Sequence, residues 1–383
     1  MSPEEARAWL RLLLCPGLGP AAVRRLLAAL GSPQAVAHAD VHVLAQLVPQ
    51  REAQALAHPD AAFEQQLADQ WARTQAWLGA GADRALISLG DAAYPSRLLD
   101  LADPPLLLFA EGDLSLLAAP SVAVVGSRHA TAQGVDNARA FAQALSAAGV
   151  TVVSGLARGI DAAAHEGALD GQLLLAPAGR PGGTVAVVGT GLDVVYPKGH
   201  TALARRIAAR GLMLSEFPFG TPPLRGNFPK RNRLVAALSR GTLVVEAAVQ
   251  SGSLITARLA ADLGREVLAI PGSIHAPQSR GCHALIRQGA RLVETSQDVL
   301  EEIGLASPSA APLAAGAATA TPDHDEAASP LLLAMGHDPV SLEALSARTG
   351  LGPADLGAQL LELELMGEVA RLPGALFQRR QAA

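Results

Sequence analysis

The chain has 383 residues, of which 50% are hydrophobic and 17% are charged, and it carries a formal net charge of −5 at pH 7. This length predicts several domains with sizeable cores, and no run of about 18 uncharged apolar residues indicates a membrane span. Residues 1–6 lack the pattern that begins a secretory signal, so we expect a cytoplasmic protein without a membrane partner. Cys15 and Cys282 lie too far apart in the sequence to indicate a disulfide framework or a cysteine metal site, and we expect no metal.

Residues 1–82 predict a small helical domain. The segment 14–20, which contains Pro-Gly-Leu-Gly-Pro, and the apolar and basic residues 23–27 after it resemble a helix-hairpin-helix or SAM-like domain. In such a hairpin, backbone N–H groups at the start of the second helix meet a DNA phosphate without sequence preference. A plain turn between packed helices of a docking domain explains the same residues, and both interpretations stay open. Trp71 and Trp77 are predicted to be core residues rather than base-stacking platforms.

Between residues 83 and 305, short β-branched runs alternate with alanine-rich helical stretches. We predict strands at 122–125, 150–153, 185–188, 212–214, 243–245, 267–270 and 291–293. The helices are predicted at 131–148, 160–169, 200–210, 229–240, 254–263 and 283–288. Runs that are apolar on both faces and separated by helices are typical of a parallel sheet covered on both sides. The pattern predicts an α/β fold, an extended Rossmann-like doubly wound core whose ligand crevice lies at the carboxyl ends of the strands.

Residues 306–328 are mostly Ala, Pro, Ser and Thr, a composition too poor in large apolar residues to pack, and we predict a flexible linker there. Residues 329–383 follow with three short helical stretches and a hairpin around Pro373-Gly374, an order that suggests a winged helix. The would-be recognition helix at 353–366 contains acidic residues and no basic one. Arg371, Arg379 and Arg380 in or after the wing could still touch DNA. Because a phosphate backbone repels an acidic helix, we favour a role of this domain in protein contact or autoregulation.

The segment 226–233, Gly-Asn-Phe-Pro-Lys-Arg-Asn-Arg, places three cations at the predicted start of a helix. A helix N-terminus carries a partial positive charge and unpaired N–H groups, so cations are unfavourable there unless an anion binds beside them. No Asp or Glu occurs between residues 217 and 245, although the whole chain is acidic, and such a local basic window is typical of a phosphate footprint. An exposed, solvated helix face is the alternative, although such faces ordinarily mix both charges.

Four predicted strands end in polar turns that contain glycine, at residues 126–128, 154–161, 189–193 and 246–253. Glycine lets backbone N–H groups approach a phosphate closely, and Ser and Thr hydroxyls add further donors. Any one of these turns is equally explained as an ordinary connection in an α/β protein. Four of them at one rim, together with the basic segment, favour a phosphate-binding crevice.

No motif for nucleotide hydrolysis accompanies these turns, because the first lacks a G-x-G-x-x-G array and the last lacks the lysine of a Walker loop. Asp161 and His165 stand four residues apart on a predicted helix and could share a metal, but helix capping and packing explain them more simply. Glu216 and Glu246 lie at strand ends without a nucleophile or a third ligand beside them. We therefore predict no catalytic residue and no cofactor.

Seven short motifs together carry a resemblance to one family. They are Ala-Val-Val-Gly-Ser-Arg at 123–128, Ser-Gly-Leu-Ala-Arg-Gly-Ile-Asp at 154–161, Gly-Leu-Asp at 191–193, Tyr-Pro-Lys at 196–198, Phe-Pro-Lys-Arg-Asn-Arg at 228–233, Ser-Gly-Ser-Leu-Ile-Thr-Ala at 251–257 and Pro-Gly at 271–272. From about residue 84 to residue 303, the chain resembles the DNA-processing protein A family (DprA, also called Smf). A small helical domain before the core and a winged helix after it also fit this family.

The resemblance implies a non-catalytic mediator that binds single-stranded DNA, protects incoming strands during natural transformation and loads the recombinase RecA onto them. It implies a homodimer that needs no cofactor. Contacts with double-stranded DNA and with single-strand-binding protein are left open.

The resemblance also assigns roles by position. Phosphates would be neutralised by Arg128, Lys198, Lys230, Arg231 and Arg233. Hydrogen bonds would come from Gly126, Ser127, Ser154, Gly155, Asn227, Asn232, Ser251 and Gly252, and Phe228 would stack on a base. Phosphate neutralisation with one or two stacking contacts gives binding that tolerates any sequence. Self-association would use the end of the core at 283–292, with His283, Ile286 and Leu292.

The chain departs from the family pattern at two places. Residues 171–183 look like an insertion, whose apolar residues 173–175 and Pro177 would pack on the core or extend an interface, and Lys230 adds a cation at a variable position. The alternative function is a nucleotide-phosphate-binding enzyme similar to the phosphoribohydrolases, which share this type of core. Those enzymes need a carboxylate in a Gly-Gly-x-Gly-Thr-x-x-Glu loop, where this chain has Ala257 and Arg258.

Overall fold

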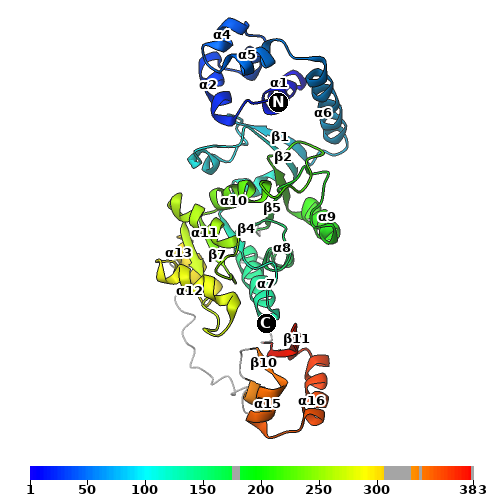
Figure 1. The fold of residues 1–383 in the computed structure, drawn as a ribbon, viewed down its shortest axis with the longest axis vertical. Coiled ribbons are helices and arrows are strands. Elements are labelled where there is room, and N and C mark those ends of the chain that lie inside the picture. The colour runs from blue at the N-terminus through cyan, green and yellow to red at the C-terminus, as the bar shows by residue number, and fades with distance from the viewer. Residues whose placement is uncertain (175–181, 306–328, 336–338, 381–383) are drawn as a thin grey trace.

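The computed structural model describes residues 1–174, 182–305, 329–335 and 339–380. The molecule is elongated, with a helical region at one end, an α/β core in the middle and a small helical and stranded unit at the other end (Figure 1). The linker predicted at 306–328 lies outside the described residues. Within the described ranges, no helix combines the length and the apolar character needed to cross a membrane.

The N-terminal region contains six helices, α1 (Pro3–Leu14), α2 (Pro20–Leu30), α3 (Pro33–Ala37), α4 (Val41–Ala45), α5 (Gln50–Ala57) and α6 (Ala61–Gly79). Four of them begin at a side chain that accepts a hydrogen bond from the first turn, which satisfies an otherwise unpaired N–H group; these are Ser2, Ser32, Asp40 and Asp60. Trp71 and Trp77 pack against the apolar core of this region, and the Trp77 ring lies 5.1 Å from that of Phe219. Their prediction as core residues is confirmed.

Two antiparallel strands that the sequence analysis missed join this region to the core. β1 (Arg84–Ser88) pairs with β2 (Leu107–Gly112), which pairs in turn with β6 (Leu212–Ser215). Side chains of β2 alternate between the two faces of the sheet, so Leu107 and Phe109 pack with the N-terminal helices. Leu108 and Ala110 pack into the core on the opposite face. One strand therefore contributes to two hydrophobic clusters.

The other strands form the predicted parallel sheet. They are β3 (Ser121–Val125), β4 (Thr151–Ser154), β5 (Thr184–Val187), β7 (Gly241–Val244), β8 (Glu266–Ala269) and β9 (Arg291–Leu292). The complete sheet has the order β1-β2-β6-β5-β4-β3-β7-β8-β9, and all pairs from β6 to β9 are parallel. The order reverses at β3, whose neighbours are β4 and β7. In a doubly wound fold, such a switch point is where ligands bind.

Helices cover both faces of this sheet, as the sequence predicts (Figure 1). One face carries α7 (Ala132–Ala147), α8 (Ile160–Gly171), α9 (Thr201–Arg210) and α13 (Ser296–Glu302); the other carries α10 (Asn227–Leu238), α11 (Ser253–Asp262) and α12 (Arg280–Arg287). In β3, Val122 and Val124 face α7 and α8, while Ala123 and Val125 face α10 and α11. Short 3-10 turns complete the connections at η1 (Ser96–Asp100), η2 (Leu114–Leu117), η3 (Lys198–His200) and η4 (Pro277–Ser279).

The predicted insertion lies between α8 and β5. Leu173 and Leu174 are 71% and 47% exposed, so these two residues do not pack into the core. Leu175 and Pro177 fall within residues 175–181, outside the described residues.

The C-terminal unit is a winged helix, which confirms the prediction. It contains α14 (Pro330–Met335), β10 (Val340–Ser341), α15 (Leu342–Thr349), α16 (Pro353–Leu365), β11 (Val369–Leu372) and β12 (Leu376–Arg379), and the strand order is β10-β12-β11. The acidic residues of α16, Asp355, Glu362 and Glu364, are all exposed. The hairpin of β11 and β12 forms the wing, which lies on the side of this unit that faces the core (Figure 1).

Candidate nucleic-acid interface

A cavity of about 420 Å³ opens at the switch point of the sheet. Turns after three parallel strands line it, at residues 126–129 after β3, at Ala157 and Asp161 after β4, and at Ala248 and 250–253 after β7. Helix α10 contributes Arg231, Asn232 and Val235 from above the sheet. The predicted crevice is therefore present in the position that the strand order dictates. Of the four glycine-bearing turns, the one at 189–193 lies outside the lining of this cavity.

The turn after β3 is held tightly against its neighbours. A Cβ at Gly126 would lie 2.6 Å from Ile160 Cγ1 and 2.8 Å from the Glu246 carbonyl oxygen, so only glycine fits there. The Ser127 N–H donates to the same carbonyl at 2.8 Å, and the Ser127 hydroxyl accepts from the His129 N–H at 3.1 Å. These contacts fix the turn and leave the side chain of Arg128 exposed at the rim.

The turn after β4 is fixed from below by helix α8. Asp161 accepts hydrogen bonds from the N–H groups of Gly155, at 3.2 Å, and Ala157, at 3.3 Å. His165 Nε2 accepts from the Leu156 N–H at 3.2 Å, and its Nδ1 lies 2.6 Å from the Thr184 hydroxyl. Leu156 has a φ of 59°, a left-handed conformation that is unfavourable for leucine and that these bonds stabilise. His165 is fully buried, which confirms that it packs. Asp161 does not cap α8 as predicted, because this helix begins after Gly159 without a side-chain cap and the carboxylate holds the preceding turn instead.

The burial of His165, Asp161 and Arg231 around this turn shifts the pKa of each side chain. Burial, and then the nearby positive charge of Arg231, lowers the pKa of His165 to about 3, so the imidazole is neutral and can accept at Nε2. Burial raises the pKa of Asp161, an effect that Arg231 opposes. Burial likewise lowers the pKa of the Arg231 guanidinium, while Asp161 opposes that change. Asp161 and Arg231 are thus buried groups of opposite charge that stabilise each other at the floor of the crevice, with the neutral His165 buried nearby.

The basic segment divides into buried and exposed residues. Helix α10 begins at Asn227, two residues before the predicted start, and Asn227 is buried with its amide donating to the Gly189 carbonyl at 3.1 Å. Arg231 is only 4% exposed. Its guanidinium packs against Gly155, because a Cβ at Gly155 would lie 1.2 Å from Arg231 Nη1. Lys230 is exposed, and Asn232 is half-buried in the lining of the cavity. The cations at this helix start therefore serve different purposes.

Arg233 is held by carboxylates instead of facing solvent. Its Nη2 donates to Glu216 Oε2, and its Nε lies 3.3 Å from Asp103 Oδ2. The side chains of Arg233 and Glu216 are each 12% exposed. Burial raises the pKa of Glu216, an effect that Arg233 opposes. A phosphate contact of Arg233 would have to compete with this ion pair, and its assignment to DNA stays a prediction.

An aromatic surface adjoins the crevice. The guanidinium carbon of Arg128 lies 5.7 Å from the centroid of the Phe228 ring. The centroid of the Tyr196 ring lies 5.6 Å from that of Phe228. Tyr196 is 47% exposed, and Lys198, two residues later, is also exposed. The family resemblance implies stacking by Phe228 alone. The Tyr-Pro-Lys motif at 196–198 was the signal that could have added Tyr196.

The remaining predicted donors lie in two places. The hydroxyls of Ser251 and Ser253 are 2.7 Å apart at the start of α11, and the Ser251 hydroxyl also accepts from the Ser253 N–H at 3.3 Å. Gly252, the exposed residue before this helix, has no side chain to cap it. Ser154 is fully buried, and its hydroxyl donates to the Val124 carbonyl at 2.7 Å. Ser251 and Gly252 are thus available to a ligand, whereas the Ser154 side chain is used within the sheet.

The acidic residues at the strand ends are engaged in structural contacts. Glu246 accepts from the Thr131 N–H at 3.0 Å and from its hydroxyl at 2.5 Å, which anchors the start of α7. Glu216 binds Arg233, so the two carboxylates do not act as a pair. Ala257 is buried and Arg258 is exposed at the positions where the phosphoribohydrolase-like alternative needs an acid. Among the described residues, no group of three His, Cys, Asp or Glu side chains could hold a metal.

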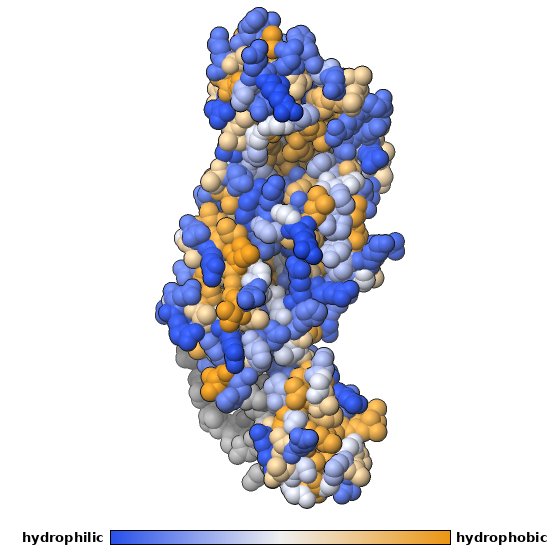
Figure 2. All heavy atoms as spheres, viewed as in Figure 1, coloured by the Kyte–Doolittle hydropathy of each residue, from blue (hydrophilic) through white to orange (hydrophobic). Residues whose placement is uncertain are grey.

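The residues predicted for self-association lie at the last edge of the sheet. Leu292 belongs to the edge strand β9 and is 49% exposed, while Ile286 of α12 packs partly against the core. His283 Nε2 lies 3.4 Å from the Gly272 carbonyl. Apolar side chains gather over α11 and α12 on the face shown in Figure 2. The interface itself stays a prediction.

Comparison with known proteins places this architecture in one family. The model described as DNA recombination-mediator protein A matches residues 85–304, and that of the DprA winged helix domain matches residues 315–375. The chain belongs to the DNA recombination-mediator protein A family. Protein Smf of Escherichia coli is 42% identical over 303 residues, which cover 78% of each of the two chains.

Two solved structures of DprA proteins resemble the chain as well. The X-ray structure of DNA processing protein A from Streptococcus pneumoniae aligns with a TM-score of 0.62 at 37% identity and covers 79% of this chain and 98% of that one. The DNA processing protein A from Helicobacter pylori, solved for insight into its single-stranded DNA binding mode, aligns with a TM-score of 0.50 at 31% identity. That match covers 57% of this chain and 94% of the other. The predicted resemblance to the DprA family is confirmed.

Proposed function

We propose that this DprA-family chain binds single-stranded DNA in the crevice at the switch point of its sheet. The observation that carries the proposal is the combination of exposed cations, Arg128, Lys198 and Lys230, with the aromatic pair of half-buried Phe228 and exposed Tyr196. Cations that follow the phosphates and rings that accept any base are the two parts of a sequence-tolerant single-strand site. The single-stranded DNA binding named for the Helicobacter pylori relative supports the same role here.

Binding of a fluorescent strand of about 20 nucleotides across a salt series tests this proposal. Arg128→Ala, Lys198→Ala and Lys230→Ala should each weaken binding and flatten the slope of log affinity against log salt by roughly 0.7 per lost phosphate contact. Arg258→Ala is the control for Arg128→Ala, because this arginine of α11 is also exposed but, unlike Arg128, does not line the cavity. If the three variants bind like the wild type, the strand does not lie in this crevice.

We further infer that the bound strand is protected and handed to the recombinase RecA during natural transformation. The family membership supports this role, and the absence of a suitably placed carboxylate at Ala257 and Arg258 supports a mediator over a phosphoribohydrolase. Assembly of RecA on strands covered with single-strand-binding protein should become faster when the chain is added. Arg128→Ala should remove most of the acceleration. An unchanged assembly rate with the wild type would contradict the mediator role.

A homodimer through α12 and β9 completes the proposal. The exposed Leu292 on the edge strand supports this surface, because an uncovered edge strand with an apolar side chain invites pairing with another chain. Leu292→Glu should shift the molecular mass in light scattering from that of a dimer toward that of a monomer. Val43→Glu, in α4 of the N-terminal region, where this side chain is 40% exposed, is the control and should leave the mass unchanged.

Duplex DNA binding at the N-terminal hairpin is a separate part of the proposal. Gly17 has a φ of 81° in the turn after α1, and α2 begins after Gly19. A Cβ at Gly19 would meet nothing within 4 Å, so Gly19→Glu fits the fold and places a negative charge at the start of α2. This variant should weaken binding of duplex DNA but not of single strands. Equal duplex affinity in the variant and the wild type would assign the hairpin a purely structural role.

A further inference from the structure

The winged helix is attached to the core beside the crevice. Arg380, directly after β12, donates to both carboxylate oxygens of Asp136 in α7, through Nε at 2.9 Å and Nη2 at 2.7 Å. A bidentate pair of this kind fixes orientation as well as distance. It directs the wing, not the acidic helix α16, toward the core (Figure 1).

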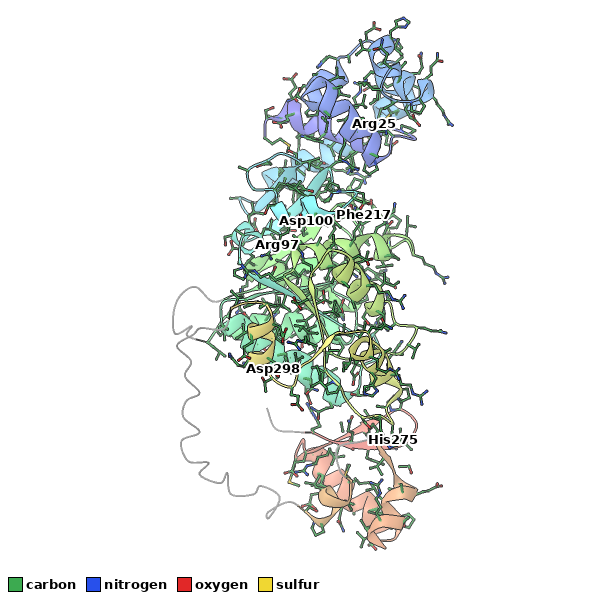
Figure 3. The ribbon with its side chains drawn as sticks, turned by 90° about the vertical axis from the view of Figure 1, so that its left-hand side faces the viewer. Arg25, Arg97, Asp100, Phe217, His275 and Asp298 are labelled. Atoms are coloured by element: carbon green, nitrogen blue, oxygen red, sulfur yellow. The ribbon has the colours of Figure 1, made fainter. Side chains whose placement is uncertain are left out.

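A second cavity of about 520 Å³ lies between the wing and the core. Leu372, Pro373 and Leu376 line it from the wing, and His129 and His275 are among the residues that line it from the core. Figure 3 shows His275 at the end of the core that adjoins the winged helix, and Figure 2 shows the surface indented between the two units. No Lys, Arg, Asp or Glu is among the described residues that line this cavity.

This cavity adjoins the crevice, because His129 and Gln278 line both. The Gln278 amide donates through Nε2 to the His129 carbonyl at 3.2 Å. Its Oε1 is buried and accepts no hydrogen bond from the described residues. A buried acceptor without a donor is unfavourable, and a ligand that brings an N–H group into this place would satisfy it.

The chemistry of the lining selects the occupant. A site without a charged Lys, Arg, Asp or Glu does not attract a phosphate, and apolar side chains facing imidazoles suit a flat, uncharged ring. We propose that this cavity binds a nucleobase of the strand held in the crevice, with the wing as one of its walls. The inference rests on the proposed function and extends the single-strand site into the winged helix. Gln278 Oε1 would accept from an exocyclic amino group, so cytosine and adenine are preferred to thymine.

A strand of about 20 thymidines with a single 2-aminopurine at successive positions tests the proposal, because the fluorescence of this base falls when it stacks. At one position, the wild-type chain should quench the fluorescence, and His275→Ala and Leu372→Ala should restore it. Both variants should weaken binding of the full strand about 5-fold, the loss of roughly one stacked base, without changing the salt slope. Gln278→Leu should remove the preference for cytosine over thymine at the quenched position.

Ile274→Ala and Leu365→Ala are the matched controls, since these apolar side chains are 75% and 82% exposed and line neither cavity. His275 is exposed as well, so His275→Ala should unfold at the wild-type urea concentration. Wild-type quenching and affinity in both His275→Ala and Leu372→Ala would overturn the proposal. If Arg128→Ala and Lys198→Ala still weaken binding in that case, only the base site at the wing is wrong. If they too bind normally, the proposed function itself fails.

Discussion

Replacing Arg233 by alanine separates a structural role of the basic segment from a role in DNA binding. In the structure, Arg233 and Glu216 form an ion pair in which each side chain is 12% exposed, and Asp103 lies 3.3 Å from Arg233 Nε. Removing one partner of a largely buried pair leaves the other charge uncompensated, which costs about 3–5 kcal/mol. We expect about 3 kcal/mol, the lower end, because burial already raises the pKa of Glu216 and the carboxylate can take up a proton. Asp103, which is 53% exposed, adds little.

Urea unfolding followed by tryptophan fluorescence measures this loss as a lower midpoint. Lys230→Ala is the matched control, since Lys230 is exposed one turn earlier on the same helix, and its stability should change by less than about 0.5 kcal/mol. The double variant with Arg233→Met and Glu216→Leu should recover most of the stability, because it leaves no unpaired charge. A wild-type midpoint for Arg233→Ala together with a large drop in strand affinity would refute the structural role and assign Arg233 to a phosphate.

Three further predictions test the site. Gly155→Ala should lower stability by about 1–3 kcal/mol in thermal unfolding, because its Cβ would collide with Arg231, whereas Gly252→Ala, with open space around it, should be neutral. His165 has a pKa of about 3 in the folded chain, against an ordinary value of 6.5. Between these two pH values, His165 binds a proton in the unfolded chain but not in the folded chain. Stability should therefore fall by about 2 kcal/mol between pH 6.5 and 5, and less in His165→Gln. Phe228→Ala should weaken strand binding about 5-fold or more at an unchanged salt slope; full affinity would exclude stacking.

The parallel part of the sheet was predictable because its strands are short runs of β-branched residues, which favour a strand over a helix. β1 and β2 were missed for a physical reason. The sequence of β2, Leu-Leu-Phe-Ala-Glu-Gly, is dominated by residues that favour helices or have no strong preference for strands. It is extended because β1 and β6 pair with it on both sides and because both of its faces are buried. Such tertiary constraints do not appear in a local pattern.

The candidate site was predicted at the level of the crevice but not of each cation. The absence of Asp and Glu from residues 217–245 suggested that all three cations of α10 bind phosphates. The first residue before that window is Glu216, which binds Arg233, and the charged partner of Arg231 is Asp161 on another helix. A sequence window cannot show which carboxylates the fold brings close. Arg128, Lys198 and Lys230 have exposed side chains, and their contact with phosphates stays a prediction.

Because β2 contributes side chains to two hydrophobic clusters, it couples the unfolding of the N-terminal helices to that of the core. Since Leu107 and Phe109 complete the interior of the N-terminal helices while Leu108 and Ala110 complete that of the core, neither interior can open without uncovering the other face of the same strand. Residues 1–305 should therefore melt in one calorimetric transition, and the winged helix, which has its own interior, should melt in a second. A chain that lacks residues 1–82 would expose Phe109 and Phe219 and would associate through these side chains. Deleting the N-terminal helices therefore does not by itself reveal their role in DNA binding.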